Sequence, residues 1–146
     1  MFQMKPKRIY STQFGGIIIL KRKVDRMKFK ITFPFLPPSV NHAYAVRKQG
    51  MYMKRSAKDF VEEVQLLTKQ ALKKQKFTKI PAGNFFVMEV YFTFKNKRFP
   101  DPNNMLKILI DAFEGFVFEN DKWLLPRVMD AKITGKNSTT IVFKPL

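Results

Sequence analysis

The amino-acid sequence predicts an α/β (α+β) fold, in which a single mixed β-sheet of about four to five strands carries two main helices. Three patterns predict this fold. Alternating apolar and polar residues mark a half-buried strand over residues 28–35. Apolar residues recur at helical spacing over 60–71 and again over 105–116. Between these two helical patterns, residues 84–94 are aromatic and β-branched, which is typical of a long central strand.

The first strand and first helix follow from the first half of the chain. The strand places four apolar side chains on one side: Phe29, Ile31, Phe33 and Phe35. Prolines at 34, 37 and 38 end it, because proline cannot donate a hydrogen bond to the sheet. We expect a stiff loop over 37–42 and a short strand over 51–54. The first helix is expected to begin at Ser56, a favourable N-cap, and to bury Phe60, Val64, Leu67 and Ala71.

The second helix opens at Asp101-Pro102, because aspartate is favoured as an N-cap and proline as the first helical residue. Gly115 marks its expected end. Two closing strands are expected over 128–134 and 139–143, joined by a turn at 135–137. The predicted order is strand, short strand, helix, strand, helix and two strands.

Composition excludes several classes of protein. The chain has 146 residues and a mass of 17.2 kDa, which suits one compact domain. Its 45% hydrophobic residues, with 16 Phe, exclude a disordered basic tail. The lack of cysteine and the single histidine exclude a disulfide-stapled module and a thiolate or histidine-rich metal site. The longest aliphatic run, Ile17 to Leu20, is far below the ~20 residues of a membrane span, so we expect a cytoplasmic protein without a membrane partner.

The chain divides into two parts. Residues 1–26 are expected to be a basic N-terminal extension, and residues 27–146 the domain itself. The extension lacks the small-residue cleavage site and the longer apolar stretch of a signal peptide. Met27 is a second candidate for the first residue of the protein.

The charge of the chain points to a polyanionic partner. Lys and Arg number 28 against 11 Asp and Glu, so the formal net charge is +17. The usual partner of such a surface is nucleic acid, bound through its phosphates in a salt-sensitive manner. An anionic membrane surface and a merely lysine-rich proteome are the alternatives that composition alone leaves open.

The acidic residues are not spread evenly along the chain. Five of the eleven fall between positions 101 and 121: Asp101, Asp111, Glu114, Glu119 and Asp121. Carboxylates repel phosphate, so an acidic island in a cationic protein suggests a magnesium site that bridges carboxylates to phosphates. The alternative is a group of ordinary solvated helix and loop acids.

The start of the second helix gathers the side chains that such a site needs. These are Asp101, Asn103, Asn104, Lys107 and Asp111. The last three share one helix face, away from the apolar stripe, while Asp101 sits over the first turn. Asp121 joins them if the loop after the helix folds back. Each residue also has a structural role open to it, with Asp101 as an N-cap and Lys107 paired with Asp111.

Two segments resemble a known family. The stretch D-P-N-N-M-L-K-I-L-I-D-A-F-E-G over 101–115, followed by Asn120-Asp121, resembles the signature of the RusA-type Holliday junction resolvases. The segment P-P-S-V-N over 37–41 is similar to the loop that follows the first strand of that family. The resemblance covers residues 27–146, and the order of strands and helices between the two segments matches as well.

The resemblance implies an Mg²⁺-dependent endonuclease, with Mn²⁺ as a further cofactor candidate. It also implies a homodimer that makes paired nicks across a four-way DNA junction, leaving 5′-phosphate and 3′-hydroxyl ends. The family's essential carboxylates correspond to Asp101, Asn103 and Asp121, and its essential lysine to Lys107. Asn104, Asp111 and Asn120 are expected to support the site. Asn41, Lys97 and Arg98 are expected to contact DNA, and the protein is expected to associate with the nucleoid.

The sequence departs from the family pattern at two positions. Asn103 stands where the family has the second Asp, and Asn120 where it has the first Asp of a pair. An amide oxygen can coordinate Mg²⁺ but brings no charge and cannot act as a base. Three functions therefore remain open: an active resolvase, a homologue that binds branched DNA without cutting, and a basic RNA-associated module.

Overall fold

A computed structural model describes residues 28–146, so the predicted extension 1–26 lies outside the described residues. Four strands form one mixed sheet in the order β1-β6-β4-β5. They are β1 (Phe29–Phe33), β4 (Phe86–Phe94), β5 (Leu124–Ile133) and β6 (Ser138–Pro145). β6 is antiparallel to both β1 and β4, whereas β4 and β5 are parallel. The predicted mixed sheet is confirmed, with β4 in its interior.

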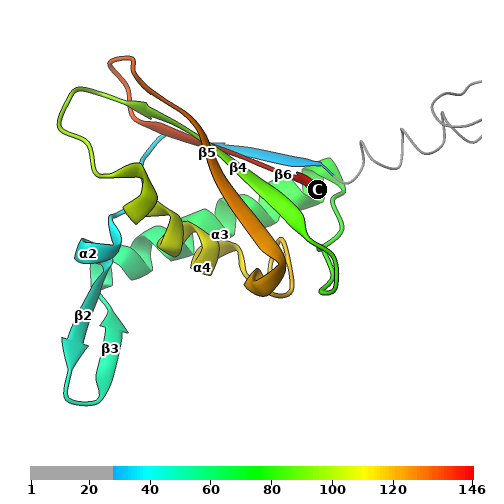
Figure 1. Ribbon diagram of the computed structural model, residues 1–146, viewed down its shortest axis with the longest axis horizontal. Coiled ribbons are helices and arrows are strands. Elements are labelled where there is room, and N and C mark those ends of the chain that lie inside the picture. Colours follow the sequence, from blue (N-terminus) through cyan, green and yellow to red (C-terminus); the bar gives the residue numbers. More distant parts are fainter. Residues whose placement is uncertain (1–27) are drawn as a thin grey trace, which may run out of the picture.

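Two helices, α3 (Arg55–Gln75) and α4 (Leu106–Phe113), cover one face of the sheet (Figure 1). The core between them is built largely from phenylalanine, with Phe29, Phe33, Phe113 and Phe143 all fully buried. The side chains alternate along β1 as predicted, because a strand presents every second residue to the helices. The sequence therefore predicted both the sheet and the helices that pack on it.

Several boundaries differ from the sequence expectation, three of them by a change with a clear local basis. α3 begins at Arg55 with Lys54 as a cap that makes no side-chain hydrogen bond, so Ser56 is not the N-cap. Residues 40–42, the end of the predicted loop, belong to the short helix α2 (Val40–Ala43), because the Ser39 side chain accepts from the Asn41 N–H and caps it. β5 begins at Leu124, four residues before the predicted strand, since it pairs with β4 from Phe86 onward.

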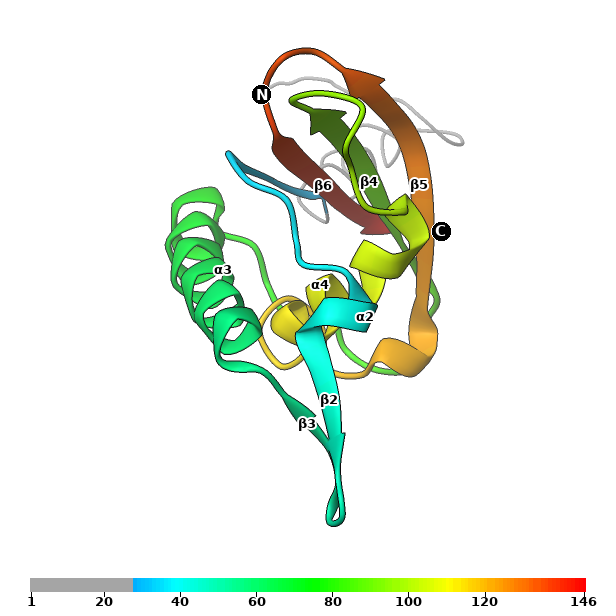
Figure 2. The ribbon, with the colours of Figure 1, turned by 90° about the vertical axis from the view of Figure 1, so that its left-hand side faces the viewer.

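A second, two-stranded sheet projects from the body of the molecule (Figures 1 and 2). It consists of β2 (Tyr44–Arg47) and β3 (Gly50–Met53). The two-residue turn Lys48-Gln49 joins them, and Arg47 pairs with Gly50 across it. β3 was predicted and β2 was not. We call this hairpin the β2–β3 ribbon.

The crossover that joins the parallel strands β4 and β5 carries the predicted site. From the end of β4 the chain passes through a loop into the 3-10 helix η1 (Pro102–Met105) and then α4. It then enters a second 3-10 helix, η2 (Asp121–Trp123), immediately before β5. Because the two strands are parallel, the helical segment must carry the chain back along the full sheet, from the end of β4 to the start of β5. Among the described residues, no helix is long and apolar enough to span a membrane.

Candidate functional site

η1 positions the polar residues that precede α4. Asp101 is its N-cap, as predicted, and its Oδ1 accepts from the backbone N–H of Asn103 at 2.9 Å. Its carbonyl oxygen accepts from the N–H of Asn104 at 3.0 Å. The side chains of Asp101 and Asn103 are exposed, and Asn104 is half-buried. Within the described part of the chain the second carboxylate oxygen of Asp101 has no hydrogen-bond partner, so it is free to bind a cation.

Lys107 and Asp111 form an ion pair one turn further along. The Lys107 Nζ lies 3.1 Å from both carboxylate oxygens of Asp111, and the lysine side chain is 59% exposed. The predicted i,i+4 pairing is therefore present. A lysine ammonium has three N–H donors, and two of them point to Asp111. The third is left for another anion at the surface.

A third residue completes this group and was missed by sequence reasoning. The Tyr44 hydroxyl, at the base of the β2–β3 ribbon, donates to Asp111 Oδ2 at 2.5 Å. Burial and the adjacent Asp111 carboxylate raise the pKa of Tyr44, so the phenol stays protonated and keeps donating. The local sequence around Tyr44 does not predict this contact, because its partner lies 67 residues away. Tyr44 and Lys107 together hold the Asp111 carboxylate from two sides.

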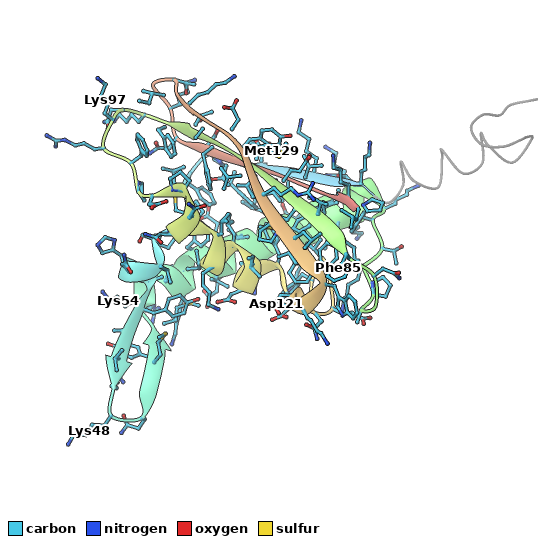
Figure 3. All side chains as sticks on the ribbon, in the orientation of Figure 1. Lys48, Lys54, Phe85, Lys97, Asp121 and Met129 are labelled. Atoms are coloured by element: carbon cyan, nitrogen blue, oxygen red, sulfur yellow. The ribbon has the colours of Figure 1, made fainter. Side chains whose placement is uncertain are left out.

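Asp121 lies at the other end of α4 (Figure 3). Its backbone N–H donates to Glu114 Oε2 at 3.0 Å. Asn120 caps η2, with its Oδ1 accepting from the Lys122 N–H at 2.9 Å. Asparagine caps as well as aspartate does, so this departure from the family pattern keeps the turn intact. Glu119 is also held at this end, where it accepts from the Ala82 N–H.

Within one chain, the loop after α4 does not return Asp121 to Asp101. Between the two residues lie four residues of 3-10 helix, eight of α-helix and the connection 114–120, and at their usual rises the helical pieces alone span about 20 Å. The expectation that Asp121 folds back fails because the parallel pairing of β4 and β5 requires the crossover to end at the far end of the sheet. Across residues 28–146, no group of three or more histidine, cysteine or acidic side chains could hold a metal ion.

The side chains predicted to contact DNA lie on the same side of the molecule as η1. Lys97 and Arg98 are exposed in the β4–η1 loop, which Phe99 anchors by stacking on Phe94 with ring centroids 4.2 Å apart. Asn41 is exposed on α2, which packs against η1 and α4. Figure 3 places Lys97, Lys54 and Lys48 along this one edge, from the β4–η1 loop to the tip of the ribbon. We call it the cationic edge.

The residues at the start of η1 suit Mg²⁺ in kind. Mg²⁺ prefers oxygen ligands and is usually held by one or two protein carboxylates together with substrate phosphates and waters. The exposed Asp101 carboxylate oxygen and the exposed Asn103 amide oxygen are donors of this type. A single chain supplies one carboxylate here, which leaves room for a second from elsewhere.

Comparison with known proteins identifies the family of the chain. The family model described as endodeoxyribonuclease RusA matches residues 34–143, a segment that runs from the end of β1 into β6 and contains every candidate site residue. No curated protein matches the full sequence. Family membership implies nuclease activity on Holliday junctions. The chain belongs to the RusA endodeoxyribonuclease family.

Proposed function

We propose that this protein is an Mg²⁺-dependent endonuclease that resolves four-way DNA junctions by paired hydrolysis of phosphodiester bonds. One observation carries the proposal: Asp101, an exposed carboxylate with an oxygen that has no partner among the described residues, follows the exposed cations Lys97 and Arg98 of the β4–η1 loop. Carboxylates repel phosphate, so this position favours a bridging cation over direct contact with DNA.

Asp101 and Asn103 would hold the ion at the start of η1. When bound, Mg²⁺ supplies a Lewis acid for the scissile phosphate and lowers the pKa of a bound water. Asn103 contributes a neutral oxygen, so the charge on this end of the site comes from Asp101 alone. The loss of Asp101 is therefore expected to be far more damaging than any change at Asn103.

Lys107 is suited to stabilise the phosphate as negative charge develops on it. Two of its N–H donors are directed to Asp111, which holds the ammonium group still, and one remains for the phosphate. Asp111 is a positioning residue in this proposal, and Tyr44 positions Asp111. Fixing the donor before the reaction avoids reorganisation in the transition state.

The second carboxylate of the site is proposed to be Asp121 of the partner subunit in a two-fold homodimer. Within one chain Asp121 is separated from Asp101 by the length of η1 and α4, yet it is exposed and its carboxylate has no partner in the described residues. A two-fold axis between two copies brings the start of one crossover to the end of the other, twice. Each dimer would then carry two identical sites, which suits paired nicks.

Exposed apolar groups beside both ends of the crossover support this contact between copies. Near Asp121, Phe85 is 50% exposed, packs edge-on against Trp123, and lines a pocket of about 310 Å³ with Ile80 and Leu146. Near Asp101, Phe99 is 41% exposed. Aromatic side chains exposed in this manner are typical of subunit interfaces.

An end-labelled synthetic four-way junction at low salt tests the function. The full-length protein is incubated with and without Mg²⁺, beside Asp101→Asn and Asn103→Asp variants. We expect paired nicks in wild type that require Mg²⁺ and disappear in Asp101→Asn. In Asn103→Asp the added carboxylate should lower the Mg²⁺ concentration needed for half-maximal nicking.

Other results would assign a different function. Tight junction binding without nicks, with cutting only in Asn103→Asp, would identify a junction-binding homologue that lost its chemistry at one residue. Tighter binding to a structured RNA than to the junction would identify an RNA-associated module.

A further inference from the structure

The β2–β3 ribbon is a prominent feature that the proposed chemistry leaves without a function. Apart from its base beside α2 and α3, it stands clear of the body in both views (Figures 1 and 2). Four residues in each strand extend it by about 13 Å. A two-stranded hairpin of this kind has no hydrophobic core of its own, so its persistence calls for a role outside the domain.

One face of the ribbon is apolar along its whole length. The cross-strand pairs Tyr44–Met53 and Val46–Met51 alternate onto this face. The pair at the base is partly buried against a cluster of Ala43, Ala57 and Ile108. The pair at the tip leaves the body: Val46 is 79% exposed and Met51 is 70% exposed. Two adjacent apolar side chains are thus presented to solvent at the end of an arm.

The tip of the ribbon also carries positive charge. Arg47 lies with its guanidinium 4.0 Å from the centroid of the Tyr52 ring, and Lys48 occupies the turn. The ribbon itself has these two cations and no acidic residue, and Lys54, Arg55 and Lys58 follow at the start of α3, where Arg55 pairs with Asp59 at 3.3 Å. Two such tips would repel each other, so a polyanion complements this surface better than a second copy of the chain.

The base of the ribbon is held firmly to the candidate site. The Lys54 N–H donates to the Ala43 carbonyl oxygen at 2.8 Å, which closes the base onto α2. The Tyr44 hydroxyl donates to Asp111, the residue that also holds Lys107. The base of the ribbon is therefore linked by these two hydrogen bonds to α2 and to the Lys107–Asp111 pair of α4.

We propose that the tip of the ribbon enters the branch point of a DNA junction, where Val46 and Met51 pack against the open face of a base pair. Arg47 and Lys48 then lie against the phosphates on either side. This inference rests on the proposed function and names the element that recognises the branch. Apolar side chains such as methionine serve as wedges between bases in other DNA-bending proteins. A linear duplex has no open base-pair face, so the wedge would have to unstack it, whereas a branch point already interrupts the stack.

The test compares a four-way junction that carries 2-aminopurine at the branch with a linear duplex of the same sequence. Binding is measured in EDTA, to prevent cutting, with the full-length protein. The variant Val46→Ser/Met51→Ser removes the apolar pair. The control is Leu66→Ser/Ile133→Ser, which changes two other exposed apolar residues on α3 and β5, at 58% and 52% exposure.

We expect wild type to bind the junction more tightly than the duplex and to raise the 2-aminopurine fluorescence, which reports loss of stacking. Val46→Ser/Met51→Ser should lose the fluorescence rise and about tenfold in junction affinity, as expected when apolar side chains are no longer buried, while its duplex affinity stays within about twofold. Arg47→Gln/Lys48→Gln should instead weaken binding to both DNAs and lower the salt dependence of binding. The control variant should behave as wild type.

Each opposite result overturns a defined part of the inference. Unchanged junction preference and fluorescence in Val46→Ser/Met51→Ser would overturn the wedge and leave the proposed function intact. A wild-type protein that does not prefer the junction would overturn the proposed function, and the wedge with it. A variant that is monomeric by light scattering where wild type is dimeric would assign the apolar pair to a subunit contact instead.

Discussion

The two ends of the η1–α4 segment differ in the charges that surround them. At its start, Asp101 follows the exposed Lys97 and Arg98 of the β4–η1 loop, and the amide side chains of Asn103 and Asn104 come just after it. At its end, Glu114, Glu119 and Asp121 gather within eight positions, and two of them are committed to backbone N–H groups. The acidic island of the sequence is therefore divided in space, with Asp111 between the halves and neutralised by Lys107.

This difference shows that residues close together in the sequence need not belong to the same site. Helical segments carry their two ends apart, so residues that flank one share a site only if a loop or another chain returns to it. The start of the segment is suited to meet DNA, and the end is suited to supply negative charge. A dimer that brings the two unlike ends together would combine these properties.

The largest expected effect comes from removing the charge at the start. Asp101→Asn should lower the Mg²⁺-dependent nicking rate at least 100-fold, because stabilisation of transition-state charge by a bound cation is worth several kcal/mol. Junction affinity in EDTA should rise or stay unchanged, since a carboxylate that repels phosphate is lost. Gel-based nicking and fluorescence anisotropy measure the two quantities.

The control for this prediction is Glu63→Gln, which changes an exposed acid on α3. Equal loss of nicking in both variants would show that net charge, not position, determines activity.

Substitution of Lys107 tests whether its ammonium group acts on the phosphate. Lys107→Met keeps the length of the side chain and removes its charge, and we expect nicking to fall about 100-fold with junction affinity lowered only severalfold. Single-turnover kinetics at saturating protein separate these effects. A variant whose defect vanishes at saturating protein would place Lys107 in DNA binding alone.

How far the sequence predicts this fold can be judged from particular elements. The alternation that begins at Phe29 predicts β1, because a strand places every second residue on one side. The apolar spacing that begins at Phe60 predicts α3, because a helix places those residues on one face. The hydrophobic pattern of the sequence does not predict the β2–β3 ribbon. Its tip residues Val46 and Met51 are apolar yet exposed, and its Lys48-Gln49 turn lacks the residues typical of hairpins.

The site was predictable to the extent that it is local. Asp101 at the N-cap and the Lys107–Asp111 pair depend on spacing along one helix, which the sequence states directly. Tyr44 and Asp121 depend on where distant segments come to lie. The contact of Tyr44 requires the ribbon, and the position of Asp121 requires the parallel pairing of β4 with β5.

A smaller effect is expected from loosening the pair that holds Lys107. Tyr44→Phe removes one donor to Asp111 and keeps the ring, so the nicking rate should fall about three- to tenfold while the fold is retained. Tyr52→Phe, on the opposite face of the ribbon, is the matched control. If Tyr44→Phe nicks at the wild-type rate, Asp111 alone is sufficient to position Lys107.

The smallest effect concerns pH. The raised pKa of Tyr44 means that folding favours its protonated form, so its contribution to stability is complete below the phenol's ordinary pKa near 10 and declines above it. Thermal melting between pH 8 and 11 should show a slightly steeper alkaline decline in wild type than in Tyr44→Phe. Parallel curves would mean that Tyr44 ionises equally easily in the folded and unfolded protein.

A mixed dimer tests most directly whether the two unlike ends form one site. Asp101→Asn and Asp121→Asn chains with different affinity tags are co-expressed, and the heterodimer is isolated by sequential capture. If each site combines Asp101 of one subunit with Asp121 of the other, one site of the heterodimer retains both residues. We predict that the isolated heterodimer makes single, Mg²⁺-dependent nicks in the junction at about half the wild-type rate. Each of the two homodimers should be inactive. A heterodimer as inactive as both homodimers, or an active Asp121→Asn homodimer, would contradict the shared site.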